Sequence, residues 1–383
     1  MSANVFQIST LNMLKTNSAF AVTEGLAYAA PYLYVTPHNG FLIAKIDPKT
    51  FTIVDTLDLS KVDSSLTGML GSYAAHGYLY ILPHLSASGD VYQGNVVRVD
   101  LANFTPAGCT VLGVLDASQS LTASNGRTDG VYGYINVQVA NQAIVTRFGL
   151  GKNFNKASIS TVSITTIAGY PVLSSNLVAV DKKNVYQIAT VVTFPGTGKN
   201  DKTMDLWLIT TPTDNFTAKA ASFQRLTNIP FLGNSVPKVY VAIDDGKNLW
   251  CPPMPALNGP MVGQYLGVMQ IPKDNPAGVK IYQGPPSQAF PSRASVSGMG
   301  IYDGHRYGYL ASDTAMQIIQ MDFEKPGVVH TIDISAWCAG YPMYGLGYDG
   351  KWGYAVSFNG GAGLCLRFHP TPDPHASDCP CCT

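Results

Sequence analysis

The sequence YDGHRYGY at residues 302–309 returns almost unchanged as YDGKWGY at residues 348–354. Each copy joins an Asp-Gly turn signal to a short run centred on aromatic residues, which is typical of a tight turn followed by a strand. Weaker copies of the pattern stand at residues 31–34, 76–80, 128–134, 183–186 and 244–250. Seven copies of one turn-and-strand unit indicate a repeat protein.

Each copy ends on a large aromatic residue, which we call its anchor. The anchors are Tyr34, Tyr80, Tyr134, Tyr186, Trp250, Tyr309 and Tyr354. Their successive spacings are 46, 54, 52, 64, 59 and 45 residues. Blades of repeat propellers are roughly 40–50 residues long, so these spacings fit blades with added loop length.

Each unit reads as four strands, and the first unit predicts them at residues 21–28, 32–36, 41–46 and 52–59. The only glutamates are Glu24 and Glu324, which argues against a mainly helical chain because Glu favours helices and Asp favours turns.

The seventh unit runs out of chain after three predicted strands, the last at residues 363–368, while a strand at residues 5–10 has no partner. A closed ring that pairs these two segments completes the last blade and hides a sheet edge. An open solenoid would leave residues 5–10 unexplained. We therefore predict an all-β, seven-bladed β-propeller over residues 1–370, closed by its N-terminal strand, with a Pro- and Cys-rich tail at residues 371–383.

The composition limits the classes of partner. The formal net charge is +0 and only 13% of residues are charged, so no electrostatic attraction to nucleic acid or anionic membranes is expected. No apolar run is long enough to span a bilayer, and residues 1–4 lack the features of a signal peptide. These features leave the compartment unknown and suggest a cytoplasmic protein or a component of a virion or surface assembly.

The repeat also resembles a known group of sequences. The words DGVYGY at residues 129–134, GNVVRVDL at 94–101, NFT at 103–105 and VLD at 114–116 resemble a repeat in uncharacterised proteins of algae, water moulds and large DNA viruses. The pattern is also similar to NHL, kelch and YVTN-type propellers. The resemblance implies a propeller with a recognition role and carries over no catalytic residue. Pro37-His38 and Pro83-His84 depart from it, because Pro-Tyr stands there in the pattern.

In a propeller, the loops between strands B and C and between successive blades share one face with the mouth of the central channel, where ligands usually bind. Candidate binding residues on that face are Glu24, His38, His84, Asp90, Tyr92, Arg127, Phe194, Trp250, Met254 and Met261. Glu24 could act as an acid, a base or a ligand contact, or it could simply pair with Arg127. His38 and His84 end equivalent strands and could join a metal site or form an aromatic rim.

Two further motifs have both a chemical and a structural interpretation. Cys379, Cys381 and Cys382 could bind a soft metal, but their spacing is not that of a zinc finger, and an extended tail explains them equally. Asn103 and Asn215 head N-glycosylation sequons at matching turns, where Asn is also a good turn former. No cofactor is implied by either motif.

The common nucleotide-binding, hydrolase and metalloprotease motifs are absent from the sequence. We therefore predict a non-catalytic binding or structural module that contacts other proteins or copies of itself in a larger particle or filament. A carbohydrate-binding propeller is the first alternative. A hydrolase or lyase that acts around Glu24 at the channel mouth is the second.

Overall fold

The computed structural model describes the chain in segments. These are residues 7–21, 23–37, 40–64, 66, 69–83, 94–115, 122–139, 141–193, 203–230, 239, 241–251, 268–282, 300–302, 304, 306–311, 316–326, 329–341, 343–357 and 363–370. The predicted tail at residues 371–383 lies outside them, so the domain boundary at residue 370 stays a prediction.

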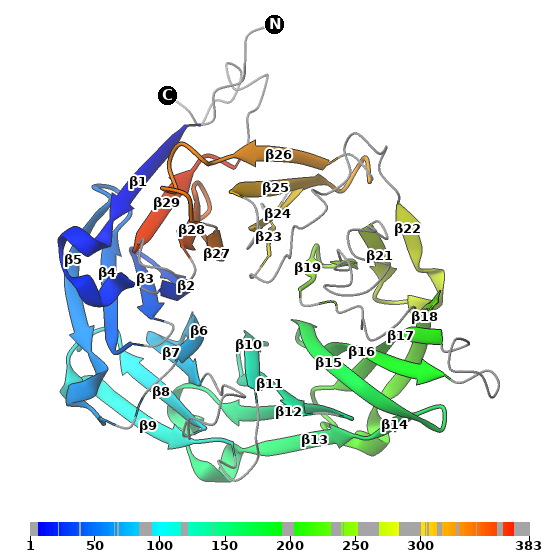
Figure 1. Ribbon diagram of the computed structural model, residues 1–383. Helices are drawn as coiled ribbons and strands as arrows, with labels where there is room; N and C mark the ends of the chain where they lie inside the picture. Colours follow the sequence, from blue (N-terminus) through cyan, green and yellow to red (C-terminus); the bar gives the residue numbers. More distant parts are fainter. Residues whose placement is uncertain are drawn as a thin grey trace, which may run out of the picture.

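Seven antiparallel sheets surround a central axis, which confirms the seven-bladed β-propeller (Figure 1). Blade one contains β2 (Thr23–Ala29), β3 (Tyr32–Pro37), β4 (Leu42–Asp47) and β5 (Thr52–Asp58). Blade two contains β6 (Met69–Ala75), β7 (Tyr78–Pro83), β8 (Asn95–Asp100) and β9 (Cys109–Gly113). Blade three contains β10 (Thr122–Thr128), β11 (Tyr132–Val139), β12 (Gln142–Gly149) and β13 (Ser160–Ile164).

The remaining blades follow in chain order. Blade four contains β14 (Thr166–Ile167), β15 (Tyr170–Val180), β16 (Asn184–Thr193), β17 (Thr203–Pro212) and β18 (Ser222–Pro230). Blade five contains β19 (Ile243–Asp244), β20 (Asn248–Cys251), β21 (Val268–Pro272) and β22 (Lys280–Tyr282). Blade six contains β23 (Ile301–Tyr302), β24 (Tyr307–Ala311), β25 (Gln317–Asp322) and β26 (Val329–Asp333). Blade seven contains β27 (Met343–Tyr348), β28 (Gly353–Ser357), β29 (Leu364–Phe368) and β1 (Ile8–Asn12).

The helices of the described part are 3-10 turns, and none is long and apolar enough to cross a membrane. They are η1 (Met13–Lys15), η2 (Ser18–Ala21), η3 (Leu59–Lys61), η4 (Pro106–Gly108), η5 (Gly151–Asn153), η6 (Lys156–Ser158), η7 (Ala218–Ala220) and η8 (Pro276–Gly278).

The N-terminal strand closes the ring, as the sequence predicts. β1 pairs antiparallel with β29, from Ile8 opposite Phe368 to Asn12 opposite Leu364 (Figure 1). The strand lies later than the predicted residues 5–10. It ends at Asn12, whose side chain accepts a hydrogen bond from the Leu14 amide at 3.0 Å and so begins η1.

The repeated Asp and the anchor aromatic bind each other. In blade three, Asp129 accepts a hydrogen bond from the Tyr134 hydroxyl at 2.8 Å. Its second oxygen accepts the backbone amides of Val131 and Tyr132, each at 2.7 Å. Equivalent bonds join Asp181 to Tyr186 (3.0 Å), Asp245 to Trp250 (2.7 Å) and Asp349 to Tyr354 (2.7 Å). The carboxylate thus fixes the turn and satisfies the polar atom of a buried ring.

The two glycines of the motif have separate physical roles. Gly130 has a φ of 89°, a left-handed conformation that favours glycine in the turn. Gly133 packs closely against Tyr73 and Phe148, and a Cβ at this position would come within 1.9 Å of the Tyr73 hydroxyl and 2.5 Å of the Phe148 ring. Every feature of the motif that identified the repeat is therefore explained by folding.

Cations tie neighbouring blades together opposite the anchors. Arg147 pairs in register with Tyr134, and its guanidinium lies 4.6 Å from the Phe216 ring of blade four. The same guanidinium donates a 2.6 Å hydrogen bond to the Thr213 carbonyl of blade four. Equivalent contacts between a cation and the Phe of the next blade are Lys45 with Phe104, Arg98 with Phe154 and Arg367 with Phe51. This contact explains why the Phe of the NFT-like turn is buried at the junction.

Blade four is longer than its neighbours and carries an unpredicted fifth strand. β16 continues seven residues past its anchor Tyr186, whereas β11 of blade three ends five residues past its anchor. In blades one and two, β3 and β7 end three residues past theirs. Four extra residues add about 13 Å of strand on the face that carries the B–C loops. The hairpin of β14 and β15 turns through Ala168 and Gly169, which both have positive φ.

The register of β1 allows a direct test of ring closure. The Met13 amide donates to the Gly363 carbonyl and the His369 amide donates to the Gln7 carbonyl, so alternation directs the Ser9 amide toward β29 and the Thr10 amide outward. Ser9→Pro is expected to lower the free energy of unfolding by about 1–3 kcal/mol, measured by urea denaturation.

Two variants serve as controls for this prediction. Ser9→Ala separates the loss of the side-chain bond to Arg367 from the loss of the amide. Thr10→Pro should be tolerated much better, because its amide faces away from the sheet. Equal destabilisation by the two proline variants would contradict the closure described above.

The bond between the Asp and the anchor predicts a partial rescue. Asp129→Ala removes three hydrogen bonds and leaves the Tyr134 O–H without its acceptor, which should cost about 2–3 kcal/mol of stability in thermal and urea unfolding. Adding Tyr134→Phe to this variant should recover about 1 kcal/mol, since no buried hydroxyl then needs a partner. Asp214→Ala, at an exposed turn position, is the matched control. A double variant that is less stable than Asp129→Ala alone would argue against this bond.

Candidate functional site

The structure tests few of the predicted binding residues. His38, His84, Asp90, Tyr92, Phe194, Met254 and Met261 lie outside the described residues, as do Cys379, Cys381 and Cys382. Glu24 lies on the innermost strand β2, but its side chain is not among those described. Within the described part, no group of three or more His, Cys, Asp or Glu residues is placed to hold a metal ion.

Arg127 and Trp250 are described, the first partly buried and the second fully buried. Arg127 lies on the inner strand β10 and donates to the Gly126 carbonyl at 3.0 Å. Burial lowers the pKa of the guanidinium to about 10. Trp250 is only 2% exposed and donates its indole N–H to Asp245. The indole therefore has a structural role in blade five.

Two aromatic residues that the sequence did not single out are exposed on the predicted binding face. Tyr170 begins β15 at the connection from blade three and is 38% exposed. Trp337 lies in the connection from blade six to blade seven and is 37% exposed. Connections between blades share a face with the B–C loops, so both rings lie on the face that the sequence nominated.

The extended part of blade four has buried side chains of its own, so its surface is rigid. Ile167 and Val172 are buried against blade three, together with Val191. Farther out, Asp205 is buried and pairs with Arg225 at 2.9 Å. We call this part, from β14 to the extended ends of β15–β18, the blade-four ridge. Its hairpin carries Tyr170.

A cavity of about 460 Å³ opens on the opposite face, between blades two and three. Its walls are the A–B turns of both blades and the C–D turn of blade three. The lining residues are His76, Tyr78, Gly130, Val131, Leu150, Gly151, Lys152 and Asn153. We call this cavity the blade-two/three pocket.

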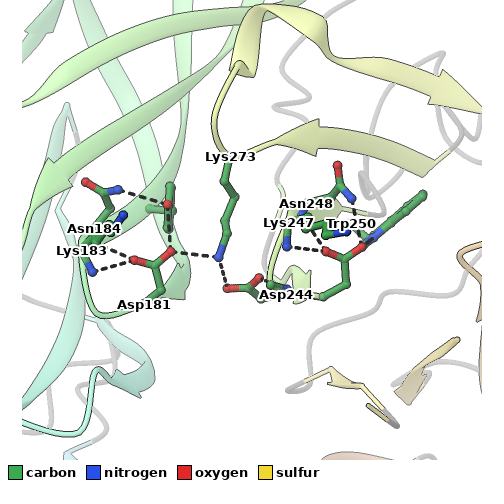
Figure 2. A network of polar contacts seen from close by, with 11 residues as sticks. Asp181, Lys183, Asn184, Asp244, Lys247, Asn248, Trp250 and Lys273 are labelled. Carbon is green, nitrogen blue, oxygen red and sulfur yellow. Dashed lines mark hydrogen bonds and ion pairs between the residues drawn. The ribbon is translucent and has the colours of Figure 1, made fainter. Parts of the chain in front are cut away.

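A charged network joins blades four and five on the same face as this pocket (Figure 2). Lys273 lies between Asp181 and Asp244, with its Nζ 2.9 Å and 3.1 Å from their carboxylates. This junction lacks the cation and Phe found at the four junctions described above, because Thr210 stands opposite the anchor Tyr186 and Pro276 follows in the next turn. Lys273 replaces them, and its Nζ lies 5.7 Å from the Tyr186 ring.

The electrostatics of this network do not suit acid catalysis. Burial by itself raises the pKa of Asp181, but hydrogen bonds from Lys273 and from the Lys183 and Asn184 amides outweigh it and hold the pKa below its ordinary value. Burial lowers the pKa of Lys273, and the two carboxylates more than compensate, so it is raised. Asp181 and Lys273 therefore stay ionised at neutral pH, as expected for a structural ion pair.

The same shifts predict a pH-dependent contribution to stability. Lys273→Met should lower the free energy of unfolding near neutral pH by about 1–2 kcal/mol. Because the pKa of Asp181 is lowered on folding, the benefit is present above about pH 4 and fades as pH falls through the folded pKa. Because the pKa of Lys273 is raised, the benefit holds below about pH 10.5 and fades at higher pH.

Urea denaturation of the wild type and the variant across this range is the measurement. Lys247→Met is the matched control, because the backbone amide of Lys247, and not its ammonium group, binds Asp245. A stability difference that stays constant from pH 3 to neutral pH would rule out the carboxylate pair as its origin.

Comparison with known proteins shows the fold. No family model and no curated protein matches the chain. Virginiamycin B lyase from Staphylococcus aureus is similar in structure, with a TM-score of 0.59, 12% identity, and coverage of 95% of this chain and 99% of that one. A streptogramin B lyase has a TM-score of 0.57 at 9% identity, over 95% and 98% of the two chains.

A third similar structure is the β-propeller domain of Cps50 (Swd1) from Myceliophteria thermophila. Its TM-score is 0.56 at 7% identity, over 95% of this chain and 100% of that one. At these identities the likeness concerns the fold alone. The propeller fold is thus shared with two lyases and with a β-propeller domain of another protein. The function of this chain must therefore be argued from its site.

Proposed function

We propose that this protein is a non-catalytic binding module that contacts another protein, or a second copy of itself, through the face of the B–C loops and inter-blade connections. The observation that carries the proposal is the blade-four ridge. It extends farther past its anchor than the described second strands of the other blades, and it carries a hairpin with an exposed Tyr170. Tyrosine is enriched at protein interfaces because its rigid ring supplies contact area with little loss of conformational entropy.

The described ionisable groups support a module without catalysis. Asp129, Asp181, Asp245 and Asp349 each hold a turn and an anchor. Burial raises the pKa of the Cys251 thiol, which leaves it protonated and unreactive at neutral pH. Among the described side chains, the conspicuous acids are therefore committed to folding.

A carbohydrate ligand is the alternative that a specific observation favours. Trp337 and Tyr170 both expose rings on the proposed face, and exposed aromatic rings provide apolar surfaces on which sugars stack. The two proposals differ in their ligand, so a glycan array with the wild type and Trp337→Ala separates them. Glycan binding that this substitution abolishes would favour the carbohydrate proposal.

Sedimentation velocity over a wide concentration range, with chemical cross-linking in the native source, tests the protein-binding proposal. Tyr170→Ser should weaken self-association or partner binding by about tenfold, the loss of a moderate interface hot spot. Val54→Ser, at a half-exposed site on β5, should change nothing. A wild-type protein that stays monomeric and cross-links to no partner would overturn the proposal.

A further inference from the structure

The structure assigns a ligand class to the blade-two/three pocket: we propose that it binds a small carboxylic acid with an apolar body. Its volume of about 460 Å³ falls in the range of small-molecule sites, roughly 300–1,000 Å³. It opens on the face opposite Tyr170 and Trp337, so this proposal stands or falls independently of the function proposed above.

The floor of the pocket is held rigidly by Gly151. Its amide donates to the Tyr80 hydroxyl at 2.7 Å, and its carbonyl accepts from the Arg98 guanidinium at 2.7 Å. A Cβ at this position would point at the His76 ring, 3.7 Å away, and would narrow the cavity. The φ of 57° there also favours glycine. A pocket whose floor is fixed on both sides loses little entropy when it binds a ligand.

His76 lines the pocket from a turn position that normally disfavours a bulky residue. It has a φ of 54° and is followed by Gly77 with a φ of 78°, a two-residue hairpin turn in which Asn or Gly normally comes first. A bulky residue in this region costs about 1–3 kcal/mol. The imidazole Nε2 donates to the Gly130 carbonyl across the blade junction, which fixes the ring at the wall.

The charge around the pocket favours an anion. Among the described lining residues, Lys152 carries a positive charge beside His76 and Tyr78, and none has a carboxylate. Arg98 lies behind the wall, 4.6 Å from the Tyr78 ring. The acids nearest in sequence hold their own turns: Asp100 accepts the Ala102 amide and Asp129 accepts the Val131 amide.

The remaining lining is mostly apolar, with Asn153 as its polar member. Val131 is 56% exposed at the rim, and Leu150 is buried in the floor. An inorganic anion would bind Lys152 but leave Val131 exposed to water. A carboxylate that carries an aliphatic or aromatic group matches both halves of the pocket.

Isothermal titration with benzoate and 3-methylbutanoate tests the proposal, with benzamide as the uncharged isostere. Both acids should bind measurably and benzamide should bind at least about tenfold more weakly, a difference of about 1.4 kcal/mol. A tetrapeptide with a C-terminal leucine carboxylate, compared with its amide, shows whether the pocket prefers a peptide end to a free acid. The proposal is supported whether the free acid or the peptide carboxylate binds more tightly.

Variants locate the site. Lys152→Gln should weaken benzoate binding by about tenfold, whereas Lys156→Gln on the neighbouring η6, outside the lining, should leave it unchanged. His76→Asn removes the imidazole but suits the turn, so it should weaken binding without loss of thermal stability. The absence of binding by every acid, equal binding of benzamide, or equal effects of the two lysine variants would overturn the proposal.

Discussion

The pairing of β1 with β29 is the interaction on which the ring depends. Without β1, blade seven would consist of three strands and expose the edge of β29. The segment that follows β1 also contributes Met13 and Phe20, both fully buried, to the core between blades seven and one. Because each blade is covered by its two neighbours, opening one junction removes support from both sides of it. The first strand therefore stabilises the whole propeller and not only its own sheet.

Within that ring, folding accounts for most of the conspicuous sequence. The Asp of the motif fixes a turn, and the glycines allow the positive φ and the close packing of that turn. The final aromatic residue fills the core and donates a hydrogen bond to the Asp. Cations such as Arg147 then join this unit to the Phe of the next blade. The junction between blades four and five uses a different tie. There Lys273 and Asp181 supply it after both members of the usual pair have been replaced.

The sequence was sufficient to predict the architecture, because aromatic anchors and Asp-Gly turns recur in chain order. The cation opposite four of the anchors could have been predicted in the same way, since a residue count along strands B and C pairs Tyr134 with Arg147. The β14 hairpin was missed because Thr166 and Ile167 form only a two-residue strand. The blade-two/three pocket could not be foreseen, since three turns far apart in the chain form it. Most predicted site residues lie outside the described part of the chain, so their placement stays a prediction.

Amide hydrogen exchange along β1 tests the central claim most directly. If closure supports the whole ring, the Ser9 and Leu11 amides should exchange as slowly as that of Leu366 in β29, through the same global opening, while the outward Thr10 amide exchanges quickly. Uniformly fast exchange along β1, beside slow exchange in β28 and β29, would contradict the account. It would show that the first strand opens on its own and leaves the propeller intact.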